Sequence, residues 1–139
     1  MDQSIIFLFA AIIIVGGLLF AIIGMTKKGV GHLDVERYRV KWLAIEQNLK
    51  RDEISSYHLA VLYADKLVDQ VLKEKNLKGE TMGERMKSAS NLLTKRNDFW
   101  TAHKLRNQIA HEPDVVVTYE LAQRALASFK QALKDLGAI

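Results

Sequence analysis

Residues 106–111 read RNQIAH, so an arginine, an amide and an imidazole lie within less than two turns of a helix. A guanidinium presents a planar fork of N–H donors that suits a phosphate group. An imidazole titrates near neutral pH, which suits proton transfer. Pro113, the only proline of the chain, disfavours helical geometry at Glu112. The sequence therefore predicts a phosphate-binding group and an acid–base group at the end of one helix.

A helical wheel separates these side chains into two neighbouring arcs. Phe99, Ala102, Leu105 and Ile109 form an apolar arc, with Arg106 close to it, and the next arc contains Trp100, His103, Asn107 and His111. Arg106 and His111 are about 140° apart on a regular helix and roughly 7.5 Å apart along it, so they point in different directions. We expect Pro113 to distort the helix end so that the imidazole swings toward Arg106.

The pattern of Arg106, the polar Asn107, the small Ala110 and His111 resembles the R-x4–6-H motif of the HEPN superfamily. Members are small α-helical bundles in which the motif ends an inner helix and a further helix follows. The resemblance covers residues 33–139 and is specific only in the motif and the order of helices. It implies RNA cleavage without a metal or cofactor, by a homodimer. It also implies that His111 is the acid–base group, Arg106 holds the scissile phosphate and Asn107 orients one of them.

Further substrate contacts are predicted around the motif. His103 and Trp100 lie on the same arc as Asn107, and Trp100 could stack on a base. Between residues 85 and 106 there are six basic residues and one acid, which gives +5, against +4 for the whole chain. Lys104 and Arg96 belong to this segment, which could steer phosphates. A solvated helix face beside an anionic membrane would have the same composition.

Each of these residues also has a purely structural interpretation. Arg106 could pair with Asp65 or Asp69 on another helix, and His111 could bind the last carbonyls of its own helix. Trp100 could belong to the core, and the amide of Asn107 could simply be exposed. The second class of function is thus a non-enzymatic helical module that binds a protein or a nucleotide and dimerises at the membrane.

The composition gives no sign of a metal site or a disulfide framework. The chain has no cysteine, and His103 and His111 are eight residues apart, too far for the pairing that helical zinc ligands use. Gly-rich phosphate loops and nucleophile elbows are missing from the sequence. We therefore expect no metal and no cofactor.

The N-terminal segment, residues 5–25, contains 21 residues without a charge. That length crosses a hydrocarbon core of about 30 Å. A cleaved signal peptide would have a shorter apolar run and a basic start, whereas here Asp2 precedes the run and Lys27 and Lys28 follow it. We expect a retained single-pass anchor with its N-terminus outside and the domain in the cytoplasm. The predicted organisation is an anchor (1–25), a short linker (26–32) and a helical domain (33–139).

The domain is predicted to be all-α, an up-and-down bundle of four to five helices. One helix follows the cap Asp34 with an apolar seam from Val35 to Leu49, able to pack on a neighbour or on another copy. The others are expected from about residue 54 to 74, from the capping pair Thr81 and Glu84 to Leu92 or Leu93, from residue 97 or 98 through the motif, and from 118 to 136.

Overall fold

The structure is a computed structural model that describes residues 2–26 and 32–139. It divides into two compact units, Met1–Gly31 and His32–Ile139. The predicted linker falls mainly on residues 27–31, which lie outside the described residues.

The first unit contains a single helix, α1 (Gln3–Thr26). Its segment Gln3–Gly24 is long and apolar enough to cross a membrane, by length and composition alone. None of that segment is buried, and large apolar side chains such as Phe7 and Phe20 are exposed along it. A helix with an apolar side chain on every face needs an apolar environment, which fits the predicted anchor.

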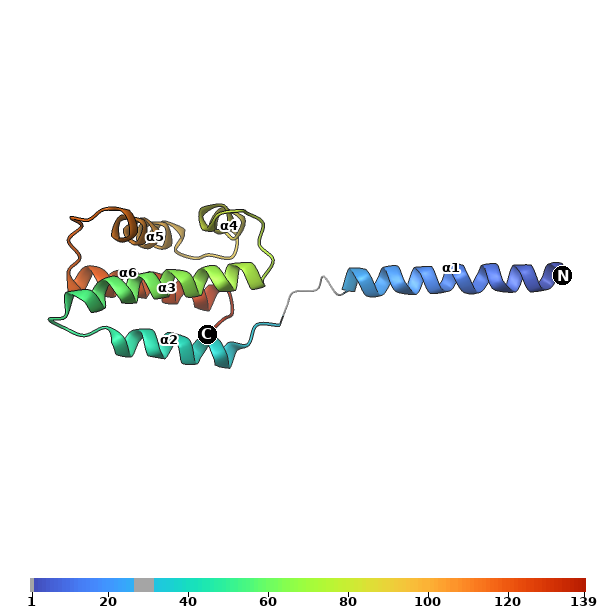
Figure 1. Cartoon of the computed structure of the whole chain (residues 1–139), viewed down its shortest axis with the longest axis horizontal. Coiled ribbons are helices and arrows are strands. Elements are labelled where there is room, and N and C mark those ends of the chain that lie inside the picture. The colour runs from blue at the N-terminus through green and yellow to red at the C-terminus, as the bar shows by residue number, and fades with distance from the viewer. Residues whose placement is uncertain (1, 27–31) are drawn as a thin grey trace. The chain divides into compact units, whose positions relative to one another are not determined.

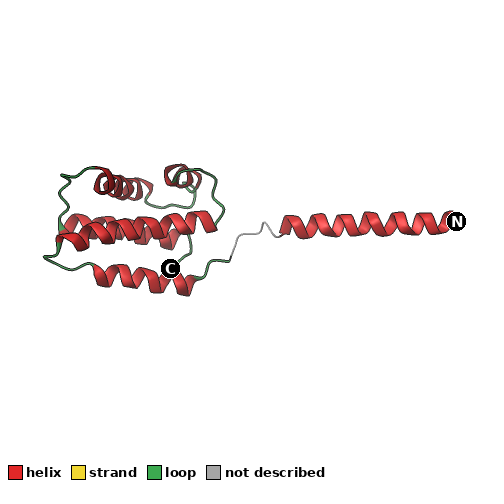
Figure 2. Cartoon of the chain, viewed as in Figure 1, coloured by secondary structure: helices red, strands yellow, loops and turns green. Residues whose placement is uncertain are grey.

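The second unit is a bundle of five helices, and its described residues contain no strand (Figure 2). The all-α fold class predicted from the sequence is therefore confirmed. The helices are α2 (Val35–Asn48), α3 (Ile54–Glu74), α4 (Met82–Ser88), α5 (Arg96–His111) and α6 (Tyr119–Asp135).

Helix α3 is the centre of this bundle and contacts each of the other four helices. Helix α6 lies along α3, helix α2 covers one side of the pair, and α4 and α5 cover the other (Figure 1). In the same view the axes of α2, α3 and α6 lie roughly parallel, whereas α4 and α5 are seen nearly end-on. The motif helix α5 is thus packed across both α3 and α6.

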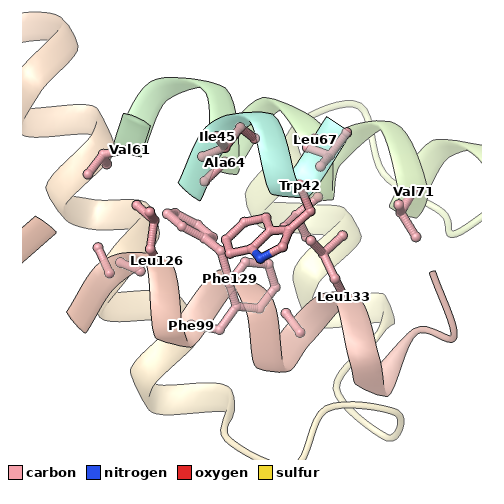
Figure 3. Close-up of a cluster of buried hydrophobic side chains, with 14 of the residues drawn as sticks. Trp42, Ile45, Val61, Ala64, Leu67, Val71, Phe99, Leu126, Phe129 and Leu133 are labelled. Carbon is pink, nitrogen blue, oxygen red and sulfur yellow. The ribbon is translucent and has the colours of Figure 1, made fainter. Parts of the chain in front are cut away.

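The core is formed by large side chains from different helices (Figure 3). Phe99 of α5 and Phe129 of α6 meet edge to face, with ring centroids 6.0 Å apart. Trp42 of α2 is also buried in this cluster, together with Tyr38 and Ile45. The predicted apolar seam of α2 therefore packs inside its own chain and is not a free dimerisation surface.

The helix ends form largely where their capping residues predict. Asp34 accepts a hydrogen bond from the backbone N–H of Arg37, and Thr118 accepts one from that of Leu121. Thr81 and Glu84 form a reciprocal capping box at the start of α4. These side chains satisfy N–H groups that a helix leaves without internal partners.

The third predicted helix is shorter than expected, since α4 ends at Ser88 and does not reach Leu92 or Leu93. The Ser88 hydroxyl donates to the carbonyls of Lys78 and Glu84, and the chain then continues in turns. Serine and asparagine compete with helical hydrogen bonds in this way, and Ser90 and Asn91 follow directly. Helix α5 begins at Arg96, one residue before the predicted start.

Glu46 links α2 to α6 and should make the bundle sensitive to acid. Its carboxylate accepts hydrogen bonds from Lys130 Nζ at 2.8 Å and Trp42 Nε1 at 2.7 Å. Burial acts to raise the pKa of Glu46, but these two hydrogen bonds outweigh it and hold the pKa below its usual 4.5. A lowered carboxyl pKa stabilises the fold above the pKa of the unfolded chain, and the stabilisation is lost as the pH falls through the folded value.

We therefore expect Glu46→Gln to lower the free energy of unfolding by roughly 1 kcal/mol at pH 7, with a difference that shrinks below about pH 4. Thermal unfolding of the parent and the variant across pH measures it. Glu36→Gln is the matched control, because Glu36 is exposed and its ion pair with Arg39 is long, at 3.8 Å, and contributes little to stability. A deficit of the same size at every pH would contradict this account.

Candidate functional site

Most of the predicted site residues lie along one stripe of α5. Arg96, Trp100, Lys104, Asn107 and His111 fall within roughly 80° of one another on the regular helix. All of them are exposed or half-buried. The apolar side of the same helix buries Phe99, Ala102 and Leu105 in the core. The packing of α5 therefore fixes which side of the helix faces solvent.

Four polar side chains form a closed loop at the junction of α3 and α5. Asp65 of α3 is 2.7 Å from His103, measured between Oδ1 and Nδ1. His103 Nε2 is 3.4 Å from the amide nitrogen of Asn107, and the amide oxygen of Asn107 accepts from Arg106 Nη1 at 2.9 Å. Arg106 Nε lies 3.3 Å from Asp65 Oδ2, which closes the loop.

The donors and acceptors of this loop agree with one another in a single arrangement. A carboxylate only accepts, so His103 donates from Nδ1 to Asp65 and leaves Nε2 as an acceptor. Asn107 can then donate to Nε2 through its NH₂ group and accept from Arg106 through its oxygen. The loop therefore assigns the tautomer of His103 and the orientation of the Asn107 amide. Flipping either group would place two donors, or two acceptors, face to face.

The guanidinium of Arg106 is held by neighbouring side chains at Nε and Nη1, and part of the side chain is accessible to solvent. Its side chain is 37% exposed, although its Nε atom is buried and has no well-aligned hydrogen bond. Nη1 is bound by Asn107, and Nη2 has no partner among the described residues. Of the two acids considered as structural partners, Asp65 is the one that binds Arg106, while Asp69 pairs with Arg85 and Lys73. A guanidinium in this position retains donors for a ligand.

His111 is the last residue of α5 and is exposed. The helix stays regular up to His111, and only Glu112 adopts an extended conformation. The expected swing of the imidazole toward Arg106 is therefore wrong, because Pro113 constrains the residue before it and not the one two positions earlier. Within the described residues no hydrogen bond joins the His111 ring to Arg106 or to a helix carbonyl.

His103 and Trp100 lie next to each other, with ring centroids 5.8 Å apart. His103 is buried, so its ring does not face solvent and serves to connect Asp65 with Asn107 inside the loop. Trp100 is 37% exposed, and the space beside its ring is bounded by Gly83 of α4. Its indole is therefore neither wholly in the core nor free, and part of it remains accessible to a ligand.

The basic segment is less available than its composition predicts. Arg85 is buried and donates to Asp69 and to the carbonyl of Gly79, so it serves as an internal ion pair between α3 and α4. Lys104 and Arg96 are exposed on α5. Among the described residues there is no cluster of three or more potential metal ligands.

Asp65 is the residue whose importance sequence reasoning underestimated. It was considered only as a possible partner of Arg106, yet it binds both His103 and Arg106 and is 2% exposed. Its position gives the signal that was available: Ala64, Leu67 and Val68, the residues around it, form the apolar side of α3. An acid among buried apolar residues requires partners, because an isolated buried charge is costly.

No protein-family model, curated protein or solved structure matches this chain. The likeness to HEPN proteins therefore rests on the motif at residues 106–111 and on the order of the helices.

Proposed function

We propose that the protein is a HEPN-like ribonuclease that cleaves RNA without a metal and is held at the membrane by residues 5–25. The observation that carries the proposal is the state of Arg106: Asp65 and Asn107 orient the guanidinium, and its Nη2 remains without a described partner at the surface. A preoriented guanidinium stabilises the charge that develops on a phosphate in the transition state. The exposed His111 lies on the same helix and supplies an acid–base group.

The proposed reaction uses the 2′-hydroxyl of the RNA as the nucleophile. His111 removes its proton, the oxygen attacks the adjacent phosphorus, and the bond to the 5′-oxygen of the next nucleotide breaks. Water donates a proton to this leaving oxygen, so that the products are a 2′,3′-cyclic phosphate and a 5′-hydroxyl. Arg106 binds the non-bridging oxygens throughout. Trp100, Lys104 and Arg96 would hold the flanking bases and phosphates.

We propose that two copies share one substrate, and the geometry of α5 supports this. Arg106 and His111 diverge by about 140° on the regular helix, so a single motif does not direct both side chains at one phosphate. In a dimer, Arg106 of one copy and His111 of the other could reach the same phosphate from opposite sides. We therefore propose a homodimer, with the N-terminus of each chain outside and each bundle in the cytoplasm.

The test is cleavage by the full chain in detergent micelles, with a mixed-sequence single-stranded RNA and excess EDTA. We expect RNA to be cut and DNA of the same sequence to remain intact, because DNA lacks the 2′-hydroxyl. Arg106→Lys keeps a positive charge but loses the fork, and we expect it to slow cleavage by at least about tenfold. Lys87→Arg on α4, outside the stripe, is the matched control. Intact RNA at every enzyme concentration, or cleavage at parent rate by Arg106→Lys, would overturn the proposal.

One observation favours the second candidate, a non-enzymatic module. The loop around Asp65 already binds part of Arg106 inside the bundle. A nucleotide-binding or protein-binding domain would use such a loop for stability alone. RNA binding without cleavage in the same assay would support this candidate.

A further inference from the structure

A groove between α2 and α3 lies on the side of the bundle away from α5. Its volume is about 480 Å³. Its floor and walls are formed by small and apolar residues of both helices: Ala44, Ile45, Leu59, Ala60, Tyr63 and Leu67. Helix α2 covers one side of the α3–α6 pair and α5 the other, so this groove is separate from the motif (Figure 1).

The walls of the groove carry large apolar side chains that are exposed to solvent. Leu59 is 48% exposed and Tyr63 is 55% exposed, one helical turn apart on α3. By contrast, the next residue along the chain in each case, Ala60 and Ala64, is buried. An apolar groove with this exposure is typical of a surface that another molecule covers.

The rim of the groove carries an uncompensated positive charge. Lys41, Lys50 and Lys66 line it, against one acid, Glu53. In the part of the chain that the structure describes, none of the three ammonium groups takes part in an ion pair. Three positive charges and one negative charge around an apolar floor complement a ligand that is apolar on one side and acidic at its edges.

The length of the groove identifies the shape of that ligand. Its lining runs along α3 from Ser56 to Gln70, which is about 21 Å at the rise of an α-helix. Helix α2 lines the groove from Lys41 to Asn48, about 10.5 Å, and the connection after it adds Lys50 and Glu53. A groove bordered by helices in this way accepts a third, amphipathic helix that lies along α3. We propose that this groove binds an acidic amphipathic helix of a partner protein, with Leu59 and Tyr63 packing against its apolar face.

The experiment is a selection with the full chain in detergent micelles. The probe is a displayed library of 16-residue amphipathic helices with fixed leucines on one face and Glu, Lys, Gln or Ser at the flanking positions. We expect acidic members to be enriched on the parent. We expect Tyr63→Asp to weaken the binding of a selected peptide at least tenfold, and Lys41→Glu with Lys66→Glu to reverse the preference toward basic members. Val116→Asp and Lys87→Glu are matched controls, at exposed positions outside the groove.

Four results would overturn the proposal. The first is no enrichment, and the second is enrichment of basic peptides on the parent. The third is a parent oligomer, measured by sedimentation, that Tyr63→Asp dissociates, because a second copy would then cover the groove. The fourth is RNA binding that the two lysine reversals abolish, because nucleic acid would then be the ligand. RNA cleavage by the parent is measured in parallel, and the proposed groove variants should leave it unchanged.

Discussion

Replacing His111 by alanine should slow RNA cleavage by about 10²- to 10⁴-fold, the usual contribution of a general acid–base group. The fold should be unaffected, because His111 is exposed at the last turn of α5 and has no hydrogen bond to the described bundle. The measurements are single-turnover cleavage rates of the full chain and its thermal midpoint. A loss of rate at an unchanged midpoint is the result that identifies a chemical role.

His32→Ala is the matched control for this variant, since His32 is also exposed and precedes α2. Its cleavage rate should equal that of the parent. Equal rates for parent and His111→Ala would remove the histidine from the mechanism.

Replacing Asp65 by alanine should destabilise the bundle by about 1–3 kcal/mol, the cost of leaving a buried hydrogen-bond donor without its partner. The carboxylate is 2% exposed and binds both His103 and Arg106. Without it, the buried Nδ1 of His103 has no acceptor, and the buried edge of Arg106 faces an apolar void. Urea denaturation of the full chain in micelles, followed by circular dichroism, measures the loss.

A double variant separates the charge from the volume of the side chain. Asp65→Leu with His103→Leu replaces the carboxylate and the buried histidine by apolar groups and keeps the partly exposed Arg106, and it should be more stable than Asp65→Ala alone. Asp98→Ala is the control, because Asp98 is exposed in the first turn of α5 and should cost no more than about 1 kcal/mol. If Asp65→Ala proved as mild as Asp98→Ala, the loop would not stabilise the fold.

The sequence predicted the helices well wherever a local signal marks them. Asp34, Thr81 and Thr118 each act on N–H groups a few residues away, so their effect is readable without knowing the tertiary structure. The end of α4 was wrong because Leu92 and Leu93 continue the apolar spacing past a serine that binds carbonyls in place of extending the helix. Hydrophobic spacing alone does not include that competition.

The candidate site was predictable in its members and not in its connections. Arg106, Asn107 and His111 are neighbours in sequence, so their spacing could be read directly. The loop depends on Asp65, 38 residues before His103, and only the packing of α3 against α5 brings the two together. The direction of the His111 side chain was wrong for a different reason. Pro113 constrains only Glu112, the residue before it, and this is enough to end the helix without distorting it at His111.

The Asp65 loop also determines how α5 can move. Sliding α5 by one turn along its own axis would carry both His103 and Arg106 away from Asp65, the one carboxylate that binds them among the described residues, and would leave that carboxylate bare in the core. The loop is therefore a register lock, which holds the motif helix in a single longitudinal position. Any adjustment to a substrate must come from side-chain rotation at the surface or from displacement of whole bundles. Sliding of α5 along its axis is therefore opposed by the loss of its contacts with Asp65.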